Sequence, residues 1–429
     1  MRDHKQITLH SVEGFKTQLL AWAQQFDDIV WLDSNQYLQP HSSYDSILAV
    51  DAFTGIQTDS VNGFQKLKEY QSMTNDWIFG YLSYDLKNDM EPLRSQNFDG
   101  LNFPDLCFFQ PKRLFLFKED KLTIRYLNVV SEEVDADLKS IETFSVQNSS
   151  SHKNNIQIES RISKNQYIKQ VSTLLSHIHR GDIYEANFCQ EFYAHADIHS
   201  LETYFKLNKI SQPPFATFLK TGDKFLLSSS PERYLKKVGL EIMSQPIKGT
   251  TRRSEQLDED ADLKMILESD PKERSENIMI VDLVRNDLSK IAQKGTVNVT
   301  ELCQIYSFKQ VHHMISTVQA KALPTISPVD IIAATFPMGS MTGAPKISAM
   351  NIIEALEATK RGLYSGTVGY FTPEGDFDFN VVIRSILYNA SKSYVSFSVG
   401  SAITSKSIPE NEYEECLVKA KAMRSVLEN

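Results

Sequence analysis

Cysteine is scarce in this chain, and long apolar runs are absent. The four cysteines, Cys107, Cys189, Cys303 and Cys416, are far apart and show no CxxC or Cys/His ligand spacing. This pattern argues against a disulfide framework and against a zinc site, and it fits a reducing cytoplasm. No apolar stretch reaches the roughly 18 residues of a membrane span, and the N-terminal segment has no signal-peptide apolar core. We therefore expect a soluble, cytoplasmic protein.

Clustered positive charge is also missing. The 429 residues carry a formal net charge of −9, and the sequence contains no block of lysine and arginine. A surface that tracks nucleic-acid phosphates is therefore not expected, and the partners should be small molecules or proteins. With 41% hydrophobic residues, the chain can bury a large core, arranged as two or three domains or as one interleaved fold.

Short apolar runs bounded by turn residues dominate the first part of the chain, for example at 29–32, 77–82 and 114–117, and they predict buried strands. We divide the chain into an N-terminal region at 1–145, a polar linker at 146–160 and a second domain at 161–426. In that domain Ser163 is expected to cap a helix that stops at Gly181, and strands are expected at 187–194 and 225–230. The alternation of strands and helices predicts an α/β fold.

One run rich in glycine and proline, at 336–346, leads into a segment with apolar residues at helical spacing. Gly339 and Gly343 would let backbone amides turn towards a ligand, and Pro345 suits the first position of a helix. Free amides at a helix start favour an anion. The alternative is an ordinary turn followed by a capped helix.

Two acidic turns each place carboxylates three residues apart. Glu273 and Glu276 follow Asp270, and Glu412 and Glu415 form a second pair near the C-terminus. Either pair can serve merely to cap a helix or to complement its dipole. If the two turns face each other, they supply the oxygen ligands that Mg²⁺ prefers.

Four further residues are candidates for chemistry. Lys248, in a turn bounded by proline and glycine, is either a desolvated nucleophilic amine or a solvated surface lysine. Glu232 is either a general acid or a capping or salt-bridged glutamate. Arg384 is expected inside an apolar strand, where it needs a carboxylate of the substrate or of the protein as its partner. His313 is the fourth candidate.

Ordered blocks between about Ser163 and Ala422 resemble the chorismate-utilising enzymes, the family of anthranilate, aminodeoxychorismate, isochorismate and salicylate synthases. The blocks lie at 181–187, 230–233, 246–250, 270–288, 336–346 and 361–370, and the acidic turn at 412–415 completes the set. The resemblance implies a large multi-stranded α/β sandwich with its active site between the sheets. It identifies 161–426 as a chorismate-binding catalytic domain and 1–145 as similar to the N-terminal region of anthranilate synthase component I.

The resemblance also implies roles for individual residues. Glu273 and Glu412 would be the main ligands of Mg²⁺, while Glu276 and Glu415 would hold metal-bound waters. Glu232 would be the acid that helps a ring hydroxyl of chorismate to leave. The residues expected to bind or line the substrate are Gly249, Thr250, His313, Tyr364, Arg384, Ala402, Ser340 and Gln190.

Two positions separate the reactions of the family. Lys248 stands where aminodeoxychorismate synthases carry lysine and anthranilate synthases carry alanine. A lysine amine can add to one ring carbon and leave ammonia to displace it at carbon 4. Gln190 stands where water-using members carry a lysine base, and glutamine cannot take a proton from water. The sequence therefore favours formation of 4-amino-4-deoxychorismate for folate synthesis.

Ammonia is expected to come from outside the chain, because the sequence contains no Gly-x-Cys-x-Gly nucleophile turn of a glutaminase. A separate glutamine amidotransferase subunit or ammonium itself would supply it, and the last step to p-aminobenzoate would belong to another protein. Two alternatives remain open. One is anthranilate formation for tryptophan synthesis. The other is a catalytically silent chorismate-binding subunit, suggested by Ala402 where many relatives have a glycine.

Overall fold

The computed structural model describes residues 2–37, 41–144, 156–309 and 311–428. The first part of the chain contains β1 Arg2–Thr8, α1 Val12–Trp22, β2 Asp28–Asp33, β3 Ser46–Thr58, α2 Gly63–Thr74, β4 Ile78–Leu82, α3 Lys87–Met90, β5 Leu106–Lys118, β6 Lys121–Leu127 and α4 Val134–Thr143. The predicted short buried strands in this region are confirmed as β2, β4 and part of β5.

The remaining elements follow the polar stretch near residue 150. They are β7 Glu159–Ser160, α5 Lys164–Arg180, β8 Glu185–His195, α6 Ser200–Ser211, β9 Phe215–Thr221, β10 Lys224–Ser230, β11 Arg233–Val238, β12 Glu241–Gln245, β13 Ile247–Arg252, α7 Leu257–Ser269, α8 Pro271–Ser289, β14 Asn298–Ser307, β15 Val311–Lys321, α9 Pro328–Thr335, β16 Gly343–Ala344, α10 Lys346–Leu356, β17 Thr367–Phe371, β18 Phe377–Asn380, β19 Ser385–Asn389, β20 Tyr394–Thr404 and α11 Pro409–Glu428.

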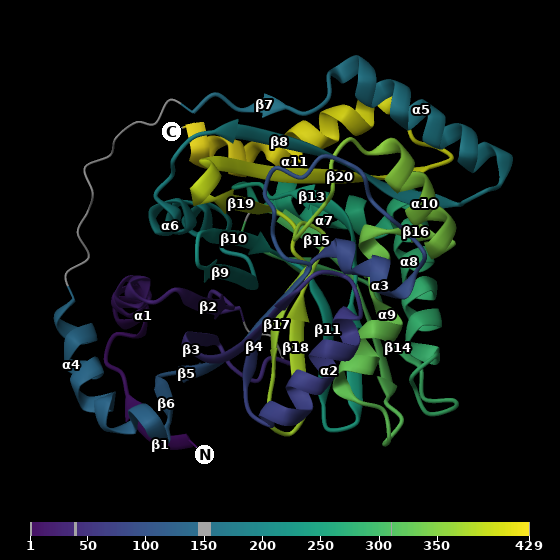
Figure 1. Cartoon of the computed structure of the whole chain (residues 1–429). Helices are drawn as coiled ribbons and strands as arrows, with labels where there is room; N and C mark the ends of the chain where they lie inside the picture. The colour runs from purple at the N-terminus through teal and green to yellow at the C-terminus, as the bar shows by residue number, and fades with distance from the viewer. Residues whose placement is uncertain (1, 38–40, 145–155, 310, 429) are drawn as a thin grey trace.

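The named strands form one connected hydrogen-bonded set in which neighbours run antiparallel. Helices cover it: α5 and α11 lie over β8 and β20, while α8 packs beside β13, β14 and β15 (Figure 1). Two large buried apolar clusters fill the space between strands and helices, one around Phe79, Phe108 and Phe379 and the other around Phe188 and Phe397. The predicted α/β sandwich is confirmed.

The predicted N-terminal region and second domain share this sheet. In β2, Trp31 pairs with Phe218 of β9, and in β4, Gly80 pairs with Gly369 of β17. Strands from 1–145 are therefore hydrogen-bonded directly to strands from 161–426. Most of the predicted linker, 146–155, lies outside the described residues, while Ile156 in its remainder is buried in the second apolar cluster.

Helix α5 forms where its local signals place it. The Ser163 side chain accepts a hydrogen bond from the Gln166 amide, and the Gln166 side chain accepts one from the Ser163 amide, so a complete capping box satisfies two orphan donors. Gly181 ends the helix with a φ of 89°, a conformation that glycine adopts at little cost. Both predicted helix ends are confirmed. Within the described ranges, no helix combines the length and apolar character that crossing a membrane requires.

Candidate active site

The glycine-rich run at 336–346 packs closely against β8. Gly343 pairs with Ala186, and a Cβ atom at Gly343 would lie 2.1 Å from the backbone oxygen of Glu185. The amide of Thr342 bonds to the Gly339 oxygen inside the run. The amides of Met341 and Thr342 are thus used inside the run and are not free to bind an anion. Pro345 is the residue before the helix rather than its first residue. Close packing explains the glycine at 343. This agrees with the alternative interpretation of the run, an ordinary turn that needs no ligand.

A buried arginine also connects this run to β8 through hydrogen bonds. Arg361 donates one hydrogen bond to the Met341 oxygen, at 2.6 Å, and another to the Asn187 oxygen, at 2.7 Å. Its charge is matched by Glu357, whose carboxylate also accepts the backbone amide of Cys189 at 2.9 Å. The run is thus fixed relative to the strand that carries Gln190.

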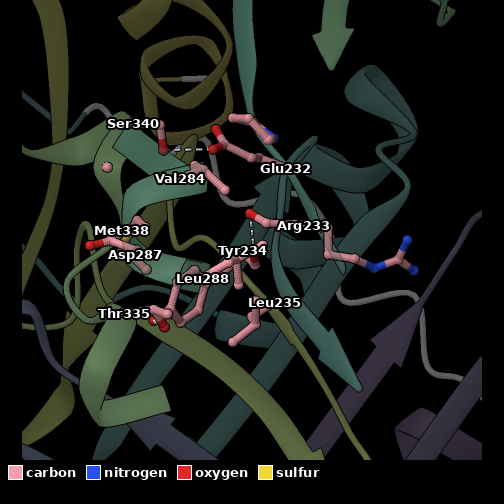
Figure 2. A pocket seen from close by; sticks show the side chains of 13 residues that line it. Glu232, Arg233, Tyr234, Leu235, Val284, Asp287, Leu288, Thr335, Met338 and Ser340 are labelled. Atoms are coloured by element: carbon pink, nitrogen blue, oxygen red, sulfur yellow. Dashed lines mark hydrogen bonds between the residues drawn. The ribbon is translucent and has the colours of Figure 1, made fainter. Parts of the chain in front are cut away.

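The run places Ser340 next to Glu232, the predicted general acid. The Ser340 hydroxyl donates to Glu232 Oε1 over 2.6 Å, and Figure 2 shows the two side chains meeting at the edge of a small pocket whose walls include Val284 and Met338. Only 4% of Glu232 is exposed. Burial raises the pKa of Glu232 to about 7, against the opposing effects of the Ser340 hydrogen bond and the Lys248 charge. Glu232 can therefore hold a proton near neutral pH, as a general acid must.

Lys248 is a buried charged amine. It lies on β13, where the pairing with β15 shifts register between Ile247 and Thr250, and the neighbouring Gly249 has a φ of +95° that favours glycine. The Lys248 side chain is 12% exposed, and its Nζ lies 2.9 Å from Oε1 of Glu185. The interpretation of Lys248 as a solvated surface lysine is wrong. Burial alone would lower the pKa of Lys248, but the nearby carboxylates, first among them Glu185, raise it above its ordinary value.

The first acidic turn begins α8 with a genuine cap. Asp270 accepts hydrogen bonds from the amides of Lys272, at 2.8 Å, and Glu273, at 3.0 Å. The Asp270 amide bonds to the Leu267 oxygen, so the Glu273 side chain is not consumed in a capping box. Both glutamates of this turn remain available for another purpose.

The two acidic turns act on each other electrostatically. Burial raises the pKa of Glu273, and Glu415 on α11 raises it further, although Lys272 opposes the rise. Burial raises the pKa of Glu276 to about 7, with Lys248 opposing and the carboxylates of Glu185 and Glu273 adding to the rise. The effect of Glu415 on Glu273 crosses from one turn to the other, so these two carboxylates lie close enough to interact through their charges.

The donor chemistry of this cluster fits a hard cation. Oxygen Oε1 of Glu276 is buried without a hydrogen-bond partner within the described ranges, and Glu412 accepts a hydrogen bond from Ser401. Carboxylates whose ionised forms repel each other are stabilised by a divalent ion, and Mg²⁺ takes oxygen ligands together with waters. In the described residues, no three His, Cys, Asp or Glu side chains lie close enough together to hold a metal ion.

Arg384 and His313 line a second pocket together with Ser229, Phe308, Lys419 and Met423. Arg384 lies in the connection between β18 and β19 with a φ of 52°, so the expectation of an arginine within a strand is wrong. In the described part of the chain its guanidinium has no hydrogen-bond or ion-pair partner. A pocket that combines this guanidinium with Lys419 suits an anionic ligand.

His313 is neutral in this setting. Burial, with a smaller effect of the Arg384 charge, lowers the pKa of His313 to about 3. Its Nδ1 lies 2.8 Å from the hydroxyl of Thr250, and its ring packs against Phe308 with centroids 5.3 Å apart. The predicted neighbours His313, Thr250 and Arg384 are thus brought together.

The other predicted substrate residues lie on or beside β8 and β20. Gln190 is 3% exposed, and its side chain lies close to the thiol of Cys416. The Tyr364 hydroxyl lies 3.6 Å from the sulfur of Cys189. Ala402 pairs with Asn187 and does not adopt a positive φ, so its Cβ is compatible with the backbone there.

Sequence reasoning missed Glu185 and Lys419. Glu185 stands inside one of the blocks that resemble the family, at 181–187, yet nothing in its neighbours distinguishes a buried acid at a strand start from a surface one. Lys419 follows Glu415 by four residues, and the 2.6 Å ion pair between them is the ordinary consequence of that spacing on a helix.

Several known proteins are similar to this chain over most of its length. The chain is 35% identical over 402 residues to the probable chloroplastic aminodeoxychorismate synthase of Oryza sativa subsp. japonica, covering 84% of this chain and 44% of that protein. It is 36% identical over 270 residues to aminodeoxychorismate synthase component 1 of Escherichia coli (strain K12), covering 63% and 59%. It is 32% identical over 361 residues to anthranilate synthase component 1 of Thermus thermophilus, covering 82% and 77%. The chain thus spans less than half the length of the plant relative.

Solved structures share the fold. Anthranilate synthase component I from Streptococcus pneumoniae TIGR4 superimposes with a TM-score of 0.78 at 26% identity, covering 90% of this chain and 93% of that one. The menaquinone-specific isochorismate synthase from Escherichia coli gives 0.77 at 16% identity, covering 100% and 95%. A family model for chorismate binding enzymes matches residues 27–425. The chain therefore belongs to the chorismate binding enzymes.

Proposed function

We propose that the chain converts chorismate and ammonia into 4-amino-4-deoxychorismate, for p-aminobenzoate and folate synthesis. The observation that carries the proposal is the presence in one site of a largely buried lysine and a buried glutamate whose pKa is raised to about 7. Lys248 is close enough to Glu232 for its charge to affect the Glu232 pKa. A lysine and an acid in this relation suit an addition to one carbon with departure of a hydroxyl from another.

The protein groups divide the work as follows. The Lys248 amine adds to carbon 2 of the ring, the ring double bonds shift, and the hydroxyl on carbon 4 leaves with a proton from Glu232. Ammonia then attacks carbon 4, the bond between carbon 2 and the lysine nitrogen breaks, and the new amine returns a proton to Glu232. The net change is replacement of a hydroxyl by an amine with release of water.

Substrate binding is assigned to the cationic pocket and its surroundings. Arg384, Tyr364 and the amides near Gly249 would hold the two carboxylates of chorismate, and neutral His313 would lie against the ring. Mg²⁺ held by Glu273 and Glu412, with Glu276 and Glu415 holding its waters, would neutralise charge in the site. These roles match the donor chemistry of the four carboxylates.

Ammonia is assigned to a separate glutamine amidotransferase subunit. The proposal rests on the names of the bacterial relatives, which are first components of a synthase, and on the absence of a glutaminase nucleophile turn from this sequence. Cytoplasmic location is proposed because all four cysteines, which lie in the described ranges, are buried thiols without disulfides.

Anthranilate formation is the second candidate, because relatives that carry that name match a similar share of the chain. The test is chromatography of the product formed from chorismate, Mg²⁺ and ammonium, with Lys248→Ala and Lys248→Arg alongside. Aminodeoxychorismate from the unmodified chain, and its loss or diversion to anthranilate in both variants, supports the proposal. Arginine keeps the charge beside Glu185 but cannot supply a neutral amine, so it separates charge from nucleophile.

Anthranilate from the unmodified chain would overturn the assignment. Absence of any product, even with a glutaminase partner present, would favour the silent chorismate-binding subunit instead. The retained Glu232, Glu273, Glu276, Glu412 and Glu415 argue against that outcome.

A further inference from the structure

The carboxylate of Glu185 contacts the Lys248 amine, and the reaction described above gives Glu185 no role. Glu185 is the first residue of β8 and is 1% exposed. Its Oε1 lies 2.9 Å from Nζ of Lys248, while its Oε2 is buried without a hydrogen-bond partner in the described ranges. A buried carboxylate with an unsatisfied oxygen is costly, so its retention beside a lysine calls for an explanation.

The backbone of Glu185 is held on both sides. It pairs with Ala344 of β16 and with Thr404 of β20, and the closely packed Gly343 leaves no space between the strands. The carboxylate is thus presented from a fixed point in the sheet. Such anchoring is typical of a group that must keep a defined distance to its partner.

Other charged groups surround Lys248 without touching it. Within the described residues, Glu185 alone forms an ion pair with its amine. The carboxylates that act on it from other elements or that feel its charge are Glu276 and Glu273 on α8, Glu415 on α11 and Glu232 before β11. The proton on Lys248 therefore has one direct acceptor.

We propose that Glu185 is a catalytic residue that accepts a proton from Lys248 and so unmasks the nucleophile. This inference rests on the proposed function, since it needs Lys248 as the attacking group. An ammonium has no lone pair, and Lys248 must lose a proton before a nitrogen–carbon bond can form. The proton moves from Nζ to Oε1 of Glu185, the lone pair forms the bond to carbon 2, and Glu185 returns the proton when the lysine is displaced by ammonia.

The arrangement also explains why a charged resting lysine is useful. A buried neutral amine would be open to other electrophiles, whereas the ion pair keeps the lone pair covered until the substrate arrives. Because the Lys248 side chain is only 12% exposed, bulk water is a poor proton acceptor once chorismate covers the site. A general base at hydrogen-bond distance typically contributes about 10²-fold to 10⁴-fold in rate.

The test uses two readouts on the full chain. The first is the rate at which cyanate carbamylates Lys248 at fixed pH in the absence of substrate, measured by mass spectrometry of the Lys248 peptide; cyanate reacts only with the neutral amine. The second is kcat for chorismate with ammonium. The variants are Glu185→Gln, which keeps the shape but removes the charge, and Glu185→Asp, which keeps the charge on a shorter arm.

Glu191→Gln is the matched control. Glu191 lies on the same strand, is 6% exposed, and pairs with Arg161 and Tyr394 away from Lys248. Circular dichroism and a thermal melt establish that each variant is folded. The control should leave the carbamylation rate of Lys248 within about twofold of the unmodified chain.

The two readouts should move in opposite directions. In Glu185→Gln we expect carbamylation of Lys248 to accelerate at least threefold, while kcat falls at least tenfold; Glu185→Asp should recover part of kcat. If both rise, Glu185 only holds Lys248 charged, and the role as proton acceptor is wrong. If carbamylation is unchanged, the ion pair does not control the amine, and the inference also fails.

The role of Glu185 and the proposed reaction are tested by separate readouts. Carbamylation reports on the ion pair whatever reaction the enzyme performs. The product from chorismate reports on the proposed function whatever Glu185 does. Anthranilate as the product, with carbamylation accelerated in Glu185→Gln, would overturn the function while leaving the ion pair intact.

Discussion

Removing the Ser340 hydroxyl should change the pH at which Glu232 loses its proton. Its hydroxyl donates to Glu232 over 2.6 Å and favours the ionised carboxylate, which lowers the pKa of Glu232 against the effect of burial. Ser340→Ala removes that donor, so the pKa of Glu232 should rise above its present value of about 7. A hydrogen bond to a charged group contributes about 1.5 to 3 kcal/mol, and one pKa unit corresponds to about 1.4 kcal/mol. The expected rise is therefore about one to two units.

The sign of the effect is specific. A general acid works while it is protonated, so activity falls as pH rises through its pKa. Ser340→Ala should extend the active range to higher pH, even if the maximal rate is lower. The assay is the pH profile of kcat/KM for chorismate with the concentration of unprotonated ammonia held constant, since ammonium titrates in the same region.

Thr335→Val is the control for this experiment. Thr335 lines the same small pocket and bonds to the Tyr234 hydroxyl, but it does not touch Glu232. Its profile should keep the alkaline limb of the unmodified chain. A limb that stays in place or moves to lower pH in Ser340→Ala would refute the assignment of Glu232 as the acid held by Ser340.

Three further predictions concern stability and metal. The Glu232 pKa of about 7 exceeds its ordinary value of 4.5, so the folded state loses stability as pH rises between these values. Glu232→Gln should therefore raise the free energy of unfolding at pH 8 by about 3 kcal/mol and leave it nearly unchanged at pH 4. Urea titration at the two pH values measures this difference. Gly343→Ala should destabilise the fold by about 3 kcal/mol or more, because its Cβ would lie 2.1 Å from a backbone oxygen; an unchanged thermal midpoint would contradict the packing. Glu276→Gln should raise the Mg²⁺ concentration for half-maximal activity about tenfold or more, and chelation should abolish activity in both proteins; equal Mg²⁺ dependence would remove Glu276 from the metal site.

Helices whose ends are fixed by nearby residues could be predicted from the sequence. Helix α5 follows from the Ser163 cap and from Gly181, because both ends are satisfied within a few residues of chain. The start of α8 follows in the same way from Asp270 and Pro271. Such features need no knowledge of what packs against them.

Features that depend on distant partners could not be predicted in this way. The role of Gly343 is set by the backbone of Glu185, more than 150 residues earlier, and the turn that holds Arg384 is set by its neighbours across the sheet. Glu232, Lys248 and the four acidic residues were candidates from their chemical type and spacing, and the resemblance to the family added their specific roles. Whether an acid such as Glu185 is buried depends on sheet register, which spacing alone does not reveal.

The central claim is that Lys248 forms a covalent bond to the substrate, and intact-mass spectrometry after rapid acid quench tests it most directly. With chorismate and Mg²⁺ but no ammonia, the account predicts an added mass of one chorismate less one water, mapped to the peptide that contains Lys248 and absent from Lys248→Arg. An adduct on another residue, or turnover to aminodeoxychorismate by Lys248→Arg at the unmodified rate, would contradict it.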